Sequence, residues 1–180
     1  MKYSNPAIES SYRIADIGKT LYDVVLDLKP KKVIEFGVLG GYSTVAMAMA
    51  LDQLGRGTIK AYDLWEKYPH KSSTMQETAE NIRAYGLEKY VELHYGDYMT
   101  VEPEPFDLLH LDVSNTGTIV REFVRKWQDK GGYILFEGGT PYRDDVDWMV
   151  KYEKEPIVGC GVEYDVINDA FPSLSIVCKN

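Results

Sequence analysis

The chain has 180 residues and a mass of 20.5 kDa, which is the size of one compact domain. Its formal charge of −8 at pH 7 argues against nucleic acids and anionic membrane surfaces as partners, because both are bound by concentrated basic faces. No apolar run approaches the ~20 residues that span a bilayer, and the N-terminal residues lack the unbroken apolar segment of a secretory signal. We therefore expect a cytoplasmic protein whose partner is a small molecule.

The first predicted element is a helix over residues 12–28, where apolar residues recur at helical spacing and Pro30 closes the segment. After it, short apolar or β-branched runs alternate with runs of helix-forming residues. The predicted strands are residues 33–36, 58–64, 90–97, 106–113 and 131–138. The predicted helices that follow are residues 44–54, 74–87, 116–130 and 145–152. This alternation is typical of a mostly parallel sheet covered on both faces.

The C-terminal part has a different pattern. Residues 161–167 and 173–179 are two strand-like runs joined by the turn-rich NDAFP, which predicts an antiparallel hairpin. We therefore predict an α/β fold with a Rossmann-like, doubly wound, mostly parallel seven-stranded sheet that ends in this hairpin. We expect one domain over residues 1–180, with an N-terminal helical cap at 1–30 and the core at 31–180.

The stretch VIEFGVLGGYST, residues 33–44, joins the first predicted strand of the core to its helix. In an open parallel sheet, ligands bind outside the carboxyl ends of the strands, at this kind of connection. Gly37 can adopt a backbone angle that other residues avoid, and Gly41 lets the chain pass close to a ligand. Ser43 stands among helix N-terminal amides, which can bind a carboxylate. Glycines at such a turn also serve packing alone.

Two acids at the ends of later strands indicate which kind of ligand the glycine loop could bind. Asp63 ends the second strand of the core, where a carboxylate can accept hydrogen bonds from both hydroxyls of a ribose. Asp97 ends the third and could accept from an exocyclic adenine amine, while Tyr98 offers a ring face to the base. Taken singly, each acid could equally be a solvated, capping or turn residue.

The order of the glycine loop, Asp63, Asp97 and FDLLHLD resembles the class I S-adenosylmethionine-dependent methyltransferases, from about Val33 to the C-terminus. The loop is most similar to the catechol O-methyltransferase type. An NAD-binding Rossmann domain is the nearest alternative, but its fingerprint is G-x-G-x-x-G. Here Val38 and Leu39 separate Gly37 from Gly40, so the second glycine of that fingerprint is absent.

The resemblance implies S-adenosylmethionine as the cofactor and gives roles to eight residues around it. Glu35 and Gly37 would shape the methionine pocket, Gly41 and Tyr42 would flank it, and Ser43 would contact the cofactor carboxylate. Asp63 would hold the ribose, and Asp97 with Tyr98 would frame the adenine.

The methyl acceptor is expected beside the ends of the fourth and fifth strands of the core. Methyl transfer is an in-line displacement that needs alignment more than a strong acid or base. Asp112 and Glu137 end these strands, and either could act as a base or orient a substrate hydroxyl. Both could also merely cap strand ends. His70, on the loop after the second strand, is a third catalytic candidate, although a solvated loop histidine is the more common interpretation.

Metal dependence is in doubt at these positions. In the metal-dependent branch of the family that the sequence resembles, the position of Asp112 is an Asp ligand and a lysine follows it three residues later. The position of Glu137 begins an Asp-Asn pair in that branch. Here the pair reads Glu137-Gly138, and Asn115 stands at the lysine position. A divalent cation on Asp112 and Glu137, completed by water or Asn115, stays open as the less favoured alternative.

The remaining candidates are weaker. His94 and His110 lie inside apolar strands, where a hydrogen-bonded structural histidine is common, and Arg143 or Asp144 could approach the substrate. We expect a methyltransferase that acts on a small molecule, at a hydroxyl. The alternative is a non-catalytic S-adenosylmethionine-binding or interaction protein with the same fold. The N-terminal helix could close a pocket or pair with a second subunit in a homo-oligomer.

Overall fold

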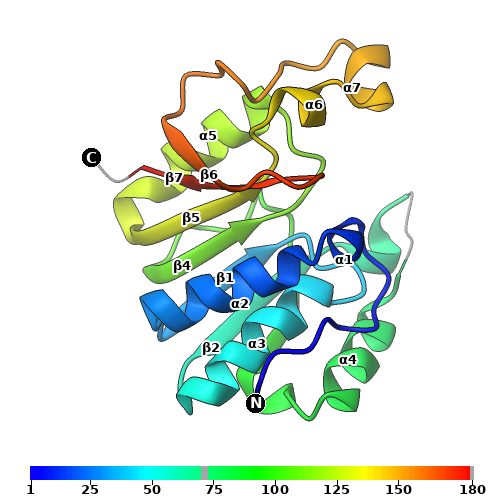
Figure 1. Cartoon of the computed structure of the whole chain (residues 1–180), viewed down its shortest axis with the longest axis vertical. Coiled ribbons are helices and arrows are strands. Elements are labelled where there is room, and N and C mark those ends of the chain that lie inside the picture. Colours follow the sequence, from blue (N-terminus) through cyan, green and yellow to red (C-terminus); the bar gives the residue numbers. More distant parts are fainter. Residues whose placement is uncertain (70–72, 179–180) are drawn as a thin grey trace.

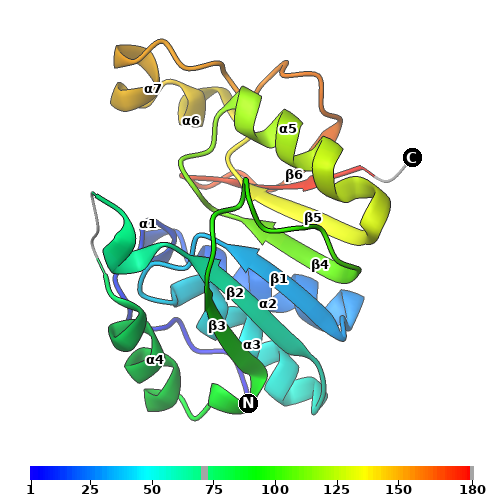
Figure 2. The ribbon, with the colours of Figure 1, turned by 180° about the vertical axis from the view of Figure 1, so that it is seen from behind.

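The computed structural model describes residues 1–69 and 73–178, and a seven-stranded sheet runs through it (Figures 1 and 2). Its strands are β1 (Lys32–Phe36), β2 (Thr58–Asp63), β3 (Val91–Tyr95), β4 (Phe106–Leu111), β5 (Gly131–Glu137), β6 (Tyr164–Asn168) and β7 (Leu174–Val177). The order is β3-β2-β1-β4-β5-β7-β6. The first five strands are parallel, and β7 is antiparallel to both neighbours. This topology confirms the predicted fold class and the C-terminal hairpin.

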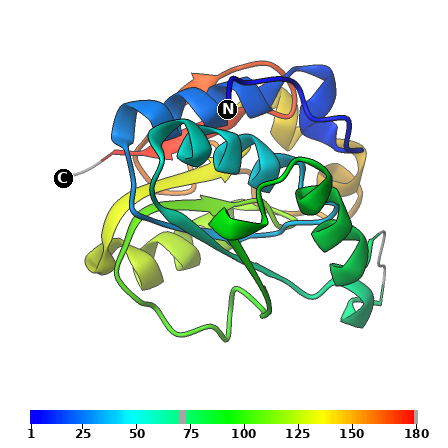
Figure 3. The ribbon, with the colours of Figure 1, turned by 90° about the horizontal axis from the view of Figure 1, so that it is seen from below.

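Helices cover both faces of this sheet, as Figure 3 shows with α2 and α3 on one face and α5 on the other. The helices are α1 (Ser11–Ile14), α2 (Ile17–Leu28), α3 (Tyr42–Leu54), α4 (Met75–Ala84), α5 (Gly117–Trp127), α6 (Pro141–Asp144) and α7 (Asp147–Lys151). Single 3-10 turns lie at Trp65–Lys67, Glu88–Tyr90 and Gln128–Lys130. Thr74 begins α4 with a capping box that Glu77 completes.

The core follows the alternation of side chains along each strand. In β1, Val33 packs into the cluster shared with α2 and α3, and Ile34 packs into the cluster shared with α5. On the second face, Phe123 and Trp127 of α5 bring large aromatic surfaces onto the sheet. Full burial of such a side chain stabilises the fold by about 2 kcal/mol. The strands are therefore fixed in register, and their carboxyl ends are held at a common edge.

The helix expected over residues 12–28 is wrong in one respect, because it is broken between α1 and α2. Asp16 adopts a left-handed backbone angle, with φ of 50°. The hydroxyl of Tyr3 donates a hydrogen bond to its carboxylate, and Tyr12 of α1 is fully buried. The break therefore turns α1 away from the α2 axis and lets Tyr12 enter the core.

The helix expected over residues 145–152 is also wrong in its bounds. The structure has two short helices, α6 and α7, with Val146 in an extended conformation between them. At the end of α6, the carboxylate of Asp144 accepts hydrogen bonds from the amides of Ile157 and Val158, at 3.0 and 2.9 Å. A polar side chain tied to a later loop thus ends the first helix, which the charge pattern of the segment did not reveal.

Within the described part of the chain, no helix combines the length and the apolar character that a membrane span requires.

Candidate functional site

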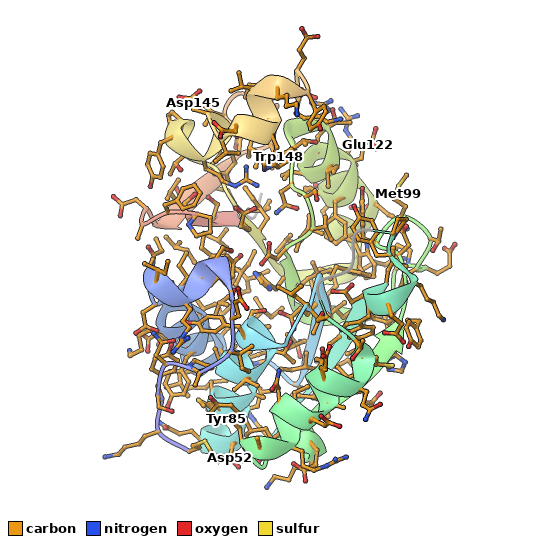
Figure 4. All side chains as sticks on the ribbon, turned by 90° about the vertical axis from the view of Figure 1, so that its right-hand side faces the viewer. Asp52, Tyr85, Met99, Glu122, Asp145 and Trp148 are labelled. Carbon is orange, nitrogen blue, oxygen red and sulfur yellow. The ribbon has the colours of Figure 1, made fainter. Side chains whose placement is uncertain are left out.

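A cleft of about 1060 Å³ opens at the carboxyl ends of the parallel strands. Figure 4 faces this edge and labels two lining residues, Met99 after β3 and Trp148 of α7. Its walls come from the loops after β1 to β5, from residues 9–11 before and within α1, and from the turn between β6 and β7. The cleft therefore lies where an open parallel sheet is expected to bind its ligand.

Gly37 brings the ends of β1 and β4 into contact. Its φ is +85°, and a Cβ at this position would lie 1.7 Å from the carbonyl oxygen of Asp112. The amide of Asp112 donates to the carbonyl of Phe36 at 2.8 Å, so the two strands approach closely just below the cleft. Only glycine fits both the backbone angle and this contact. Gly37 thus lines the cleft and also sets the spacing between two of its walls.

Asp63 organises the glycine loop through backbone hydrogen bonds. One carboxylate oxygen accepts from the amides of Val38 and Leu39, at 2.7 and 2.9 Å. The other accepts from the amides of Leu64 and Trp65, at 2.6 and 2.9 Å. A carboxylate has about four lone-pair directions, so the structure shows a loop-building role that the sequence did not suggest. Asp63 also lines the cleft, as predicted for a ligand contact.

Glu35 is fully buried and is not among the residues that line the cleft. Its carboxylate accepts hydrogen bonds from the hydroxyls of Ser43 and Thr44, each at 2.5 Å. Nδ1 of His110 lies 3.1 Å from the same carboxylate, and Nε2 lies 3.2 Å from the hydroxyl oxygen of Tyr12. Glu35 therefore joins the start of α3, β4 and α1 into one buried network. His110 has the structural role expected for a strand histidine.

The other predicted cofactor residues divide by position. Tyr42, Ser43, Asp97 and Tyr98 line the cleft, whereas Gly41, with φ of +91°, begins α3 and does not. Asp97 accepts a hydrogen bond from the amide of Met99 at 2.9 Å. The cleft thus brings together most of the residues that the resemblance assigns to the cofactor.

Asp112 lines the part of the cleft that lies at the ends of β4 and β5. Burial, together with the nearby charge of Glu137, raises the pKa of Asp112 to about 7, and His110 opposes that shift. Burial and the charges of Asp112 and Glu137 raise the pKa of Tyr12 well above its usual value. A carboxyl group that titrates near neutral pH at the edge of a cleft can accept a proton from a bound hydroxyl.

Glu137 and Arg143 form a buried, two-pronged ion pair beside Asp112. Nη2 of Arg143 donates to Oε2 of Glu137 at 2.8 Å, and Nε donates to Oε1. Both residues are 5% exposed and line the cleft. Burial raises the pKa of Glu137, and the charge of Arg143 opposes that shift. The pair therefore places a fixed guanidinium beside the predicted catalytic carboxyl groups.

Asn115 connects the ends of β4 and β5 behind this pair. Its side-chain amide donates to the carbonyls of Leu111 and Glu137, at 3.0 and 2.9 Å. Asn115 is fully buried and is not one of the lining residues. The residue at the position of the metal branch's lysine is therefore a strand clamp in this protein.

The histidine predictions have separate outcomes. His70 lies outside the described residues, so its catalytic role stays a prediction. His94 stacks on Tyr62, with ring centroids 5.2 Å apart, and does not line the cleft.

Several lining residues were missed by the sequence reasoning. They are Glu9, Ser10 and Ser11 before and in α1, Trp148 of α7, and Phe171 with Pro172 in the hairpin turn. Trp148 carries one usable signal, since it is a large aromatic residue in the short charged segment that follows β5. The others depend on long-range packing.

Residues 34–137 match a protein family described as a methyltransferase domain. The chain belongs to this methyltransferase-domain family. The matched region runs from β1 to the end of β5. It contains the glycine loop, Asp63 and Asp97, and also Asp112 and Glu137 at the ends of β4 and β5. This confirms the predicted family.

A curated relative is a catechol O-methyltransferase from Niastella koreensis, which is 31% identical over 102 residues. That alignment covers 53% of this chain and 42% of the relative, so the chain spans less than half the length of the curated relative it matches.

Two solved methyltransferases share the fold. An O-methyltransferase from Bacillus cereus, in complex with S-adenosylhomocysteine, has a TM-score of 0.64 and 20% identity, over 97% of this chain and 84% of that one. An O-methyltransferase from Streptomyces achromogenes involved in tomaymycin synthesis, in complex with S-adenosylmethionine, has a TM-score of 0.64 and 16% identity, over 92% and 81%. At these identities the likeness establishes the fold alone.

Proposed function

We propose that this protein transfers a methyl group from S-adenosylmethionine to a hydroxyl group of a small molecule. The observation that carries the proposal is the arrangement of Gly37, Asp63, Asp97 and Asp112 around one cleft, in a chain of the methyltransferase-domain family. The names of the relatives support it, since the Niastella protein is a catechol O-methyltransferase and both solved neighbours are O-methyltransferases with cofactor or product bound.

The half of the cleft at the ends of β1, β2 and β3 fits the cofactor, and we call it the donor half. The backbone amides at the start of α3, that of Ser43 among them, suit the methionine carboxylate, since the Ser43 hydroxyl donates to Glu35. Glu35, Gly37, Gly41 and Tyr42 would support that pocket. Asp63 would hold the loop that shapes the ribose site, and a ribose hydroxyl would bind this carboxylate by replacing one of its four amide donors. Asp97 and Tyr98 would frame the adenine. When bound, S-adenosylmethionine supplies an electrophilic methyl group on a sulfonium.

The half at the ends of β4 and β5 would take the acceptor, and we call it the acceptor half. The Asp112 carboxylate would accept the proton of the acceptor hydroxyl as that oxygen attacks the methyl carbon. The bound cofactor would release the methyl group with the carbon–sulfur electron pair left on sulfur. Glu137 would act through Arg143 as a positioning residue. His70 stays a candidate for a contact from the loop after β2.

Calorimetric titration with S-adenosylhomocysteine tests the donor half. We expect saturable one-to-one binding in the micromolar range, and no binding at millimolar ligand would contradict the proposal. Asp63→Ala should lose most of this affinity because both the loop and the ribose contact depend on that carboxylate. Asp129→Ala is a matched control, since Asp129 is exposed and does not line the cleft.

A non-catalytic cofactor-binding protein with the same fold is the second candidate. It is favoured by Glu137-Gly138 and Asn115, which replace the residues of the metal-dependent branch. Incubation with labelled donor and a panel of phenols, polyols and hydroxy acids separates the two. Methyl transfer that is lost in the Asp112→Asn variant would favour the enzyme. Binding of S-adenosylhomocysteine without methyl transfer to any compound of the panel would favour the second candidate.

The same proposal extends to the organisation and surroundings of the chain. We infer that residues 1–30 cap a core at 31–180 within one domain, since α1 and α2 share a hydrophobic cluster with α3 and β1. The net charge of −8 supports a cytoplasmic protein with a small-molecule partner and no nucleic-acid or membrane surface. A homo-oligomer formed through the N-terminal helices would be detected by light scattering as a molecular mass above that of one chain.

A further inference from the structure

The acceptor half has few groups that could hold a divalent cation. A hard cation such as Mg²⁺ prefers six oxygen ligands in near-octahedral geometry. At the ends of β4 and β5 the carboxylates that line the cleft are those of Asp112 and Glu137. Across the described residues, no group of three or more His, Cys, Asp or Glu side chains is placed to hold a metal ion. A cation here would therefore need both carboxylates to be free.

Glu137 is not free, because the guanidinium of Arg143 holds both of its oxygens. A two-pronged arginine–carboxylate pair is stronger and more directional than a single contact. Both partners are buried, so separating them would leave an unpaired charge in a poorly solvated position. A cation at this point would also meet the positive charge of Arg143 directly. The geometry therefore does not fit a divalent cation.

The surroundings of Arg143 keep its guanidinium in place. The guanidinium carbon lies 5.5 Å from the centre of the Trp148 ring, in a cation–π contact. Gly138 stands where the metal-dependent branch has an asparagine, and its φ of +106° favours glycine. A Cβ there would lie 2.6 Å from Cδ1 of Ile157 and 3.5 Å from Cγ of Arg143.

One donor of Arg143 remains unused. Nη1 is buried and has no hydrogen-bond partner among the described residues, although Arg143 itself lines the cleft. An unpaired buried donor is unfavourable unless a ligand or water satisfies it. This donor of the fixed positive charge is therefore unused within the described part of the chain.

We propose that the Arg143 guanidinium, clamped by Glu137, takes the place of a divalent cation in the acceptor half, and that this half does not bind divalent cations. The role of Arg143 toward a methyl acceptor rests on the proposed methyl transfer. The claim on cation binding concerns only Asp112, Glu137 and Arg143. It can be tested without turnover.

The test is a titration of the full-length protein, saturated with S-adenosylhomocysteine, with Mn²⁺ followed by electron paramagnetic resonance. We expect no saturable binding up to 1 mM Mn²⁺ in the wild-type protein. Arg143→Gln should free the Glu137 carboxylate and remove the adjacent positive charge, so that saturable Mn²⁺ binding appears with a Kd at least tenfold below that limit. Arg143→Met is a second variant for the case that the first does not fold, and Arg125→Gln is the control, because Arg125 is exposed on α5.

Saturable wild-type binding that Asp112→Asn removes would overturn the inference. So would folded Arg143 variants that gain no Mn²⁺ affinity, because another feature would then close the site. The wild-type titration decides the first point even if neither variant folds. Binding of S-adenosylhomocysteine, measured in the same samples, reports separately on the proposed function.

Discussion

The donor and acceptor halves of the cleft use acidic residues in opposite ways. In the donor half, Asp63 is held by four backbone amides, so its position follows from the path of the chain. In the acceptor half, Glu137 is held by another side chain, Arg143, across the Gly138-Gly139 turn. The first arrangement needs one acidic side chain on a given chain path, whereas the second needs two side chains to occur together. The comparison explains why the acids at the strand ends could be predicted from the sequence in both halves, whereas the pairing of Glu137 with Arg143 could not.

The largest expected effect comes from the contact that joins the two halves. Gly37→Ala should lower the free energy of unfolding by more than about 4 kcal/mol or prevent folding, because the added Cβ would overlap the carbonyl of Asp112 at a left-handed backbone angle. Urea denaturation followed by circular dichroism measures it. Gly55→Ala is the matched control, since its φ is +67° but nothing lies within 4 Å of the added Cβ. We expect that control to lose about 1 kcal/mol. Equal losses in the two variants would show that the strand contact is unimportant.

A second variant tests the backbone-based donor half. In Asp63→Asn, the side-chain NH₂ would face amide donors that now bond to a carboxylate oxygen. We expect a loss of about 3 kcal/mol in unfolding free energy, and binding of S-adenosylhomocysteine about 100-fold weaker. Asp129→Asn should change neither quantity. A variant with unchanged stability and weakened binding would mean that Asp63 serves the ligand and not the loop.

The third prediction concerns the acceptor half, where we expect an effect on catalysis and not on the fold. Since the pKa of Asp112 is raised to about 7, mainly by burial, the base form increases as pH rises through that value. The methylation rate of any acceptor found in the panel should therefore rise from pH 6 to pH 8 and then level off. Asp112→Asn should lower kcat about 100-fold, remove this pH dependence and leave product binding unchanged. A wild-type rate that is independent of pH over this range would exclude Asp112 as the base.

Local patterns predicted the sheet, the order of its elements along the chain and the strand ends that line one side of the cleft. The strand ends carrying Gly37, Asp63 and Asp97 were found because parallel strands place consecutive carboxyl ends at one edge, so that spacing along the chain reports position in space. The alternation within β1 and β4 also accounts for Glu35 and His110, which face each other across the two strands. None of this required knowledge of long-range packing.

The features that were missed depend on contacts between distant segments. The break at Asp16 involves Tyr3, and the end of α6 involves the amides of Ile157 and Val158. Arg143 was recognised only as a residue near the substrate, because its pairing with Glu137 depends on how two glycines turn the chain. Helical periodicity and charge spacing contain no information on such contacts.

The antiparallel strand β7 has a consequence for how acceptor specificity could diverge. Because β7 runs against β5, it begins at the edge where the parallel strands end, and the turn before it brings Phe171 and Pro172 to the cleft. Insertions in a surface turn between two strands are tolerated far better than changes within a strand. Homologous proteins could therefore enlarge or narrow the acceptor entrance by altering this single turn, while the strand pairing beneath it and the cofactor pocket stay the same.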